Sequence, residues 1–183
     1  MNKIIDQTFK VAIYLRLSKE DDDLSCSSGA KSESNSISNQ RKLIYDFMKS
    51  HPELELYGEY KDDGKSGSNF DRAEFQRMMK DIEAGKVNCV IVKDQSRFGR
   101  DYIDVGKYKE KIFPKLGVRF ITINEGYDSL SATSSDDLAF TINSFVYDFY
   151  IRDISTKIRT NLTAKKQNGE YAGAFVAYGY VKD

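Results

Sequence analysis

The sequence predicts an α/β fold: a parallel-dominated sheet with helices on both faces, followed by one long protruding helix. Three observations lead to this prediction. Strand-like apolar segments alternate with segments of helical periodicity from residue 11 to residue 123. The segments between successive strands are long enough to hold a helix, which is typical of right-handed crossovers between parallel strands. Residues 136–167 contain neither Pro nor Gly, which favours one uninterrupted helix.

The first predicted strand is Val11–Leu17, where alternate residues are apolar and share one face. Tyr14 and Arg16 lie on the other face, and Ser18 is next in the same row. The Asp-, Ser- and Gly-rich residues 19–35 then predict an exposed loop. The strand therefore delivers Arg16 and Ser18 to one edge of the sheet.

The middle of the chain predicts two strands, each preceded by a helix. The first of these helices begins with Ser36 as its N-cap and ends before Pro52. In the second helix the apolar residues recur at helical spacing and Gly85 ends it. The elements in order are a helix from Ser36, a strand at 54–60, a polar loop at 62–68, a helix at about 71–83 with Phe75, Met78, Met79 and Ile82 facing inward, and a strand at 87–92.

A helix at about 102–113 and a fourth strand at 118–123 complete the sheet. The long helix then covers about 136–167 and carries apolar residues at Leu138, Ile142, Phe145, Phe149, Ile154, Ile158 and Leu162. It would extend roughly 45 Å at 1.5 Å per residue, which is longer than such a domain is wide. Its far end is expected to protrude and to pack on a partner chain or a large ligand; a helix broken near Arg152 is the alternative.

The composition restricts the function classes. The 183 residues are 40% hydrophobic, and the 28 Lys and Arg equal the 28 Asp and Glu, so any nucleic-acid surface must be a local patch. Two Cys and one His exclude a Cys/His zinc site. No apolar run is long enough to span a bilayer, and the N-terminus lacks the core of a signal peptide. We therefore expect a cytoplasmic protein with no membrane partner.

Polar and charged residues follow the first three strands, where parallel sheets bind their ligands. These residues are Arg16 and Ser18 after the first strand, Asp62, Asp63, Ser66 and Arg72 after the second, and Lys93, Asp94, Ser96, Arg97 and Arg100 after the third. Guanidinium groups bind phosphate oxygens through paired donors and keep their charge at every working pH. A serine hydroxyl surrounded by arginines predicts nucleophilic chemistry on a phosphodiester.

Four sequence motifs resemble those of the serine recombinases, the resolvase/invertase family. In order they are Tyr14-x-Arg16-x-Ser18, Ser36-Ile37-x-x-Gln40, Asp63-Gly-Lys-Ser66-Gly67 followed by Arg72 and Phe75, and Ser96-Arg97-Phe98-Gly99-Arg100. They cover about residues 11–101, and the long helix continues the resemblance to about residue 166. The resemblance implies a resolvase-like catalytic domain at 1–134 and a helix for dimerisation and DNA contact at 135–168.

The resemblance also implies roles for these residues. Ser18 would attack a DNA phosphate and form a 5′-phosphoserine, and Arg16, Arg72, Arg97 and Arg100 would bind the scissile phosphate. Supporting roles would fall to Tyr14, Gln40, Asp63 and Ser66. By the same resemblance, the reaction would need no metal, nucleotide or other cofactor, and no small-molecule substrate. The expected partners are double-stranded DNA and further copies of the chain, as a homodimer on DNA and a homotetramer in the synapse, which would excise or insert a mobile element.

Two departures from the family pattern refine these expectations. The family usually has Asp where Ser96 stands, and Asp94 could supply that carboxylate, so both residues join the supporting set. The loop after Ser18 is long, and residues 169–183 look like the start of the recombinase and DNA-binding region of the large, transposon- or phage-type branch, truncated here. The alternatives are a non-catalytic α/β regulatory or partner-binding module and an enzyme that binds a small phosphate compound.

Overall fold

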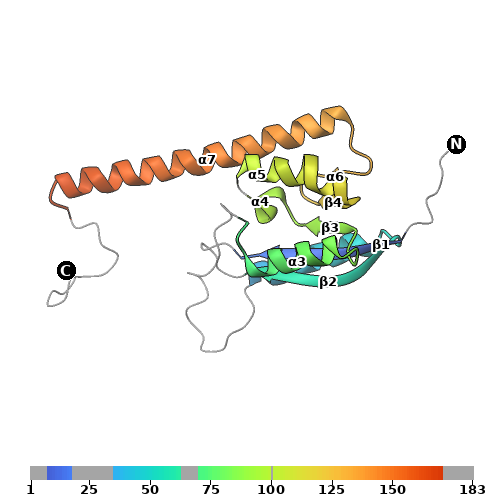
Figure 1. Cartoon of the computed structure of the whole chain (residues 1–183). Helices are drawn as coiled ribbons and strands as arrows, with labels where there is room; N and C mark the ends of the chain where they lie inside the picture. The colour runs from blue at the N-terminus through green and yellow to red at the C-terminus, as the bar shows by residue number, and fades with distance from the viewer. Residues whose placement is uncertain (1–7, 18–34, 63–69, 100, 171–183) are drawn as a thin grey trace, which may run out of the picture. The chain divides into compact units, whose positions relative to one another are not determined.

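The computed structural model describes residues 8–17, 35–62, 70–99 and 101–170 (Figure 1). Within them five strands form one sheet, in the order β2-β1-β3-β4-β5. The strands are β1 (Phe9–Arg16), β2 (Leu54–Asp62), β3 (Cys89–Val92), β4 (Arg119–Thr122) and β5 (Tyr127–Asp128). The first four run parallel, and β5 pairs antiparallel with β4. The predicted parallel-dominated sheet is confirmed, and the short β5 is an element that the sequence did not predict.

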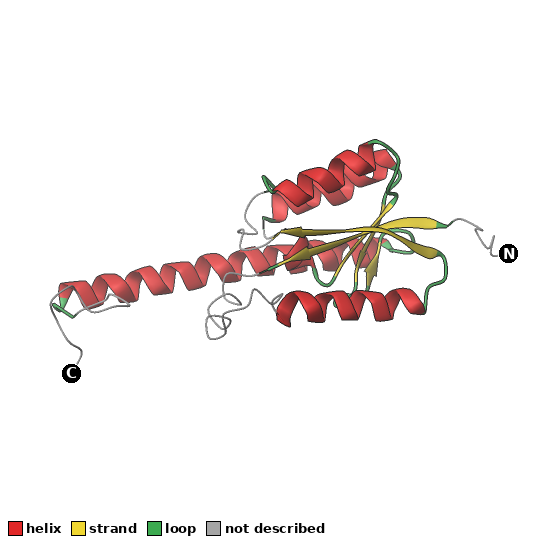
Figure 2. Cartoon of the chain, turned by 90° about the horizontal axis from the view of Figure 1, so that it is seen from below, coloured by secondary structure: helices red, strands yellow, loops and turns green. Residues whose placement is uncertain are grey.

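Helices cover both faces of the sheet, as Figure 2 shows with the sheet seen edge on. One face packs against α2 (Asn35–Lys49), through Ile37 and Ile44. The other face packs against α3 (Ala73–Glu83) and the helical segments after β3. Successive residues of β1 point alternately into the two hydrophobic cores. Ile13 lies in the core under α2, and Tyr14 lies in the core under α3. The predicted assignment of the two faces of β1 is therefore confirmed.

The predicted helix at 71–83 is confirmed as α3, and its four predicted apolar residues are buried. Gly85 follows it with φ of 69°, the left-handed conformation that glycine adopts without strain. The predicted N-cap of α2 is wrong, because the helix begins at Asn35 and Ser36 lies inside its first turn. The Ser36 hydroxyl instead accepts a hydrogen bond from Gln40 Nε2 at 3.2 Å.

The chain between β3 and β4 differs from the single helix expected there. It forms α4 (Gln95–Phe98), α5 (Tyr102–Lys107), the π-helical turn η1 (Tyr108–Ile112) and α6 (Phe113–Leu116). The prediction ended the helix at about Phe113, but the helical run continues through Pro114, which lies in the first turn of α6. The helical run ends instead at Gly117, whose φ is 66°.

The long helix is confirmed as α7 (Ser134–Gln167), 34 residues without a break at Arg152. The chain divides into two compact units, Met1–Phe145 and Val146–Asp183. Within the first unit α7 packs on the core through Phe140 and Ser144, whereas the predicted apolar residues Leu138 and Ile142 are exposed. None of the helices in the described part of the chain has the length and apolar character needed to cross a membrane.

Candidate functional site

The candidate site lies at the carboxyl ends of the parallel strands. Arg16 and Asp62 are the last residues of β1 and β2 and lie opposite each other in register. Asp94 follows β3 by two residues and caps α4. Topology therefore brings these segments to one edge of the sheet, as expected for parallel strands. Four of the predicted site residues, Ser18, Asp63, Ser66 and Arg100, lie outside the described residues.

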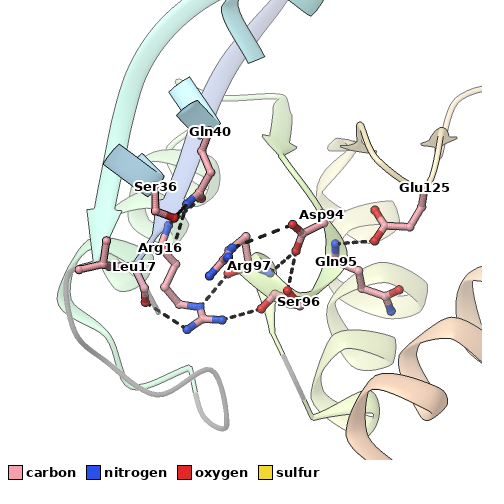
Figure 3. Close-up of polar contacts among 9 residues, drawn as sticks. All are labelled: Arg16, Leu17, Ser36, Gln40, Asp94, Gln95, Ser96, Arg97 and Glu125. Carbon is pink, nitrogen blue, oxygen red and sulfur yellow. Dashed lines mark hydrogen bonds and ion pairs between the residues drawn. The ribbon is translucent and has the colours of Figure 1, made fainter. Parts of the chain in front are cut away.

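Arg16 is buried and its guanidinium donates hydrogen bonds to main-chain carbonyls (Figure 3). Nη2 donates to the Ser96 carbonyl at 2.7 Å and Nε to the Arg97 carbonyl at 3.2 Å. Nη1 donates to the Leu17 carbonyl at 3.4 Å. The carbonyls at the end of α4 have no partner inside that helix, so Arg16 satisfies two of them. These bonds tie the end of β1 to α4.

Gln40 holds the main chain of Arg16 from the side of α2. Its Oε1 accepts from Arg16 N at 3.4 Å, and its Nε2 donates to Arg16 O at 3.3 Å. Nε2 also lies 3.2 Å from Ser36 Oγ. Through these two hydrogen bonds the end of β1 is attached to α2. They fix the main chain two residues before Ser18.

Arg72 is also fully buried, and it belongs to a hydrogen-bonded row with Tyr14 and Asp62. Arg72 Nη1 donates to the Tyr14 hydroxyl at 2.6 Å, and that hydroxyl donates to Asp62 Oδ2 at 2.9 Å. Burial raises the pKa of Tyr14, so the phenol keeps the proton that it donates. Arg72 Nη2 donates to the Phe98 carbonyl at 3.0 Å, so this row also reaches α4.

Asp62 was predicted to lie at this edge of the sheet but was given no role, and the structure places it within the arrangement. Its carboxylate accepts from Glu74 N at 3.2 Å and from Phe75 N at 3.0 Å, so it caps the first turn of α3. The sequence offered a signal for it, because Asp62 is two residues from the buried Tyr60 and so shares its face of β2. The prediction chose its neighbour Asp63 from the motif instead.

Asp94 and Ser96 surround the start of α4 and the side chain of Arg97. Asp94 Oδ1 accepts from Arg97 N at 3.0 Å and from Ser96 Oγ at 2.6 Å. Asp94 Oδ2 lies 4.0 Å from Arg97 Nε, an ion pair between side chains that are 14% and 16% exposed. The Asp94 carboxylate therefore lies beside both the main chain and the side chain of Arg97.

Glu125 is a second residue that the sequence did not reveal. Its Oε1 accepts from Gln95 N, the first amide of α4, at 3.1 Å. Glu125 comes from the turn between β4 and β5, and nothing in the spacing of the motifs connects it with residue 95. Among the described residues, no group of three or more His, Cys, Asp or Glu could hold a metal ion.

Comparisons with known proteins show which family and fold the chain resembles. The family model for the resolvase N-terminal domain matches residues 11–171. The N-terminal catalytic domain of TP901-1 integrase is similar, with 26% identity and a TM-score of 0.58, over 78% of this chain and 97% of that one. A resolvase family site-specific recombinase from Streptococcus pneumoniae has 28% identity and a TM-score of 0.54, over 87% and 99%.

A third structure is similar in fold. It is the C-terminal catalytic domain of ISC1926 TnpA, an IS607-like serine recombinase, with 22% identity, a TM-score of 0.50, and coverage of 88% of this chain and 99% of that one. None of the curated proteins matches the sequence.

Proposed function

The chain belongs to the serine recombinases of the resolvase family, and from this premise we propose that it is the catalytic domain of a site-specific DNA recombinase with Ser18 as its nucleophile. In this reaction Ser18 Oγ bonds to a DNA phosphorus and the bond from phosphorus to the 3′ oxygen breaks. The serine proton is lost and the leaving 3′ oxygen gains one. Attack by a 3′-hydroxyl on the phosphoserine reverses the step and rejoins DNA.

The observation that carries the proposal is the bonding of Arg16 to α4. Arg16 ends the strand that leads to Ser18, and it donates to the carbonyls of Ser96 and Arg97. This brings the Arg97 segment beside the end of β1. A guanidinium there would stabilise the charge that develops on the phosphate during the attack.

We propose different tasks for the four arginines. Arg97, with Arg100, would bind the scissile phosphate directly. By the family resemblance Arg16 and Arg72 would contact the same phosphate. Both also donate hydrogen bonds to main-chain carbonyls of α4, so we assign them the second task of holding α4 in place. Tyr14, Gln40, Asp63, Ser66, Asp94 and Ser96 keep their supporting roles.

We further propose that the chain acts as a homodimer on double-stranded DNA and as a homotetramer in the synapse, to excise or insert a mobile element. The support is a set of large apolar side chains exposed on the second unit. They are Val146, Tyr147, Phe149, Tyr150, Ile154, Ile158 and Leu162. Exposed apolar patches of this kind mark interaction surfaces.

Trapping the covalent intermediate tests the proposal. The chain is incubated with sheared genomic DNA from the organism that carries its gene, and adducts that resist denaturation are recovered and their DNA is sequenced. We expect adducts with the wild type and none with Ser18→Ala. Ser50→Ala is the matched control, because Ser50 is exposed just after α2 and its hydroxyl contacts only neighbours in the sequence, the Phe47 carbonyl and His51 Nδ1.

Adducts formed by Ser18→Ala would contradict the assignment of the nucleophile. If the folded wild type binds DNA and forms no adduct at all, the non-catalytic partner-binding module becomes the better description of this chain. Retained adducts with Ser50→Ala show that losing a serine hydroxyl elsewhere is harmless.

A further inference from the structure

The four-residue helix α4 is held in place by side chains from other parts of the fold. A helix this short is not stable alone, because the free-energy cost of nucleating the first turn exceeds the stabilisation from its hydrogen bonds. At its C-terminal end the carbonyls of Ser96, Arg97 and Phe98 accept hydrogen bonds from Arg16 and Arg72. The position of Arg97 therefore depends on the contacts that hold α4.

At the N-terminal end of α4 two carboxylates accept hydrogen bonds from different main-chain amides. Asp94 accepts from Arg97 N at 3.0 Å and Glu125 accepts from Gln95 N at 3.1 Å. Asp94 is adjacent to α4 in the sequence, whereas Glu125 is 30 residues away from Gln95. Glu125 thus connects the start of α4 to the turn that follows β4 (Figure 3).

The parallel pairing of β3 and β4 delivers Glu125 to this place. The pairing continues beyond both strands, with Ile123 N donating to Val92 O at 3.2 Å and Asn124 N to Lys93 O at 2.9 Å. Glu125 is the next residue along the chain, in the turn that precedes β5. Its Oε2 is buried, although the residue as a whole is only half-buried.

We propose that Glu125 is a positioning residue for Arg97, which acts by anchoring the first amide of α4; the proposal rests on the recombinase function proposed above. Gln95 is buried, so water cannot readily replace the acceptor that Glu125 supplies to its amide. Loss of that acceptor lets the start of α4 move. Arg97, two residues further on, then no longer meets the phosphate in the geometry that the transition state requires.

The first experiment separates positioning from DNA binding. Adduct formation is timed at saturating genomic DNA for wild type, Glu125→Ala and Glu125→Gln, with Glu110→Ala as control because Glu110 is an exposed residue of η1. For Glu125→Ala we expect a rate constant lower by about 10- to 100-fold, the effect of a displacement on the order of 1 Å. The DNA concentration for half-saturation should change less than about twofold, because the DNA-binding surface is intact.

Glu125→Gln distinguishes anchoring from simple loss of stability. The amide oxygen of Gln can still accept from Gln95 N, so this variant should recover most of the rate. The Glu110→Ala variant should match the wild type. A rate for Glu125→Ala equal to that of the wild type, with adducts forming normally, overturns the positioning role and leaves the proposed function intact.

The second experiment uses the free protein and needs no reaction. Amide hydrogen exchange by NMR reports the Gln95 N–H, and the Arg97 Nε–H resonance reports the side chain. In Glu125→Ala we expect Gln95 exchange to be at least about tenfold faster and the Arg97 resonance to shift, with neither change in Glu110→Ala. If the wild type forms no adduct, the proposed function fails, and unchanged exchange and resonance in Glu125→Ala would show that the positioning role fails as well.

Discussion

Arg72 shows how this fold places a charge in its interior without leaving it unpaired. Its guanidinium donates to the Tyr14 hydroxyl and the Phe98 carbonyl, and its Cζ atom lies 4.8 Å from the centroid of the Phe70 ring. Removing the Arg72 side chain takes a buried donor from both the Tyr14 hydroxyl and the Phe98 carbonyl. Arg72→Ala should therefore lower the free energy of unfolding by roughly 3–5 kcal/mol, as measured by urea denaturation.

The control is Arg152→Ala on the exposed side of α7. Arg152 is 68% exposed and pairs with Asp148 one turn earlier, a contact within one helix. Its loss should change the free energy of unfolding by less than about 1 kcal/mol. Equal losses in the two variants would mean that the row of Arg72, Tyr14 and Asp62 contributes little to stability.

Gly99 follows α4 at a point where the main chain passes close to two side chains. A Cβ built there would lie 2.5 Å from Phe70 Cζ and 2.8 Å from Val105 Cγ2. Its φ of −163° is ordinary extended backbone, so the constraint is steric and not conformational. Gly99→Ala should destabilise the fold by roughly 1–3 kcal/mol through overpacking, as measured by thermal or urea unfolding.

Gly106 provides the matched control for this substitution. It lies inside α5, and a Cβ there would have no heavy atom within 4 Å. Gly106→Ala should leave stability unchanged or raise it by about 0.5–1 kcal/mol, because Ala favours a helix interior. If Gly99→Ala is as stable as Gly106→Ala, the side chains of Phe70 and Val105 can move aside without a loss of folding stability.

At the scale of elements, the first turns of α7 are attached to the domain by Asp137. Its Oδ1 lies 2.8 Å from Lys109 Nζ and accepts from the Tyr127 hydroxyl at 2.9 Å. The hydrogen bonds from Lys109 and Tyr127 lower the pKa of Asp137 below its usual value. Stability from this group is therefore complete above the unfolded-state pKa of about 3.9 and is lost as the pH falls through the lower folded-state pKa.

Asp137→Asn removes this titration. The variant should be less stable than the wild type by roughly 1 kcal/mol at neutral pH, and the difference should shrink as the pH falls from about 5 to about 2. Urea midpoints measured across that range test it. Curves that stay parallel down to the lowest pH would show that the attachment of α7 does not depend on the charge of Asp137.

The elements that could be predicted from the sequence are those long enough to show a period. β1, α3 and α7 were predicted with their faces or lengths because alternation or helical spacing repeats several times in each. The two residues of β5 and the four of α4 are too short to show one. The proximity of Arg16, Gln40 and Arg97 could be predicted from the motifs and the parallel topology. The contact of Glu125 with Gln95 could not, because it depends on how β3 and β4 pair.

The apolar residues of α7 were expected to form one stripe, but their spacing gives two. Leu138, Ile142, Phe145 and Phe149 are separated by three or four residues, and so are Ile154, Ile158 and Leu162. Within the second unit, the step of five residues from Phe149 to Ile154 turns the helix by about 500°, so these two residues lie on different faces. All seven side chains are among the exposed large hydrophobic residues. An interaction surface on the second unit should therefore centre on Ile154, Ile158 and Leu162.

At the scale of the whole molecule, this second group predicts self-association of the chain. Burying an isoleucine side chain contributes about 1.5–3 kcal/mol, and in a symmetric dimer each substitution acts twice. Ile158→Glu should therefore weaken dimerisation by more than about tenfold, as measured by sedimentation equilibrium over a range of concentrations. Thr160→Glu is the matched control, since it adds the same charge about 200° around the helix on an exposed residue. A wild type that stays monomeric throughout, or equal weakening by both variants, would contradict assembly through this face; loss confined to Ile158→Glu would locate the dimer contact on the second unit.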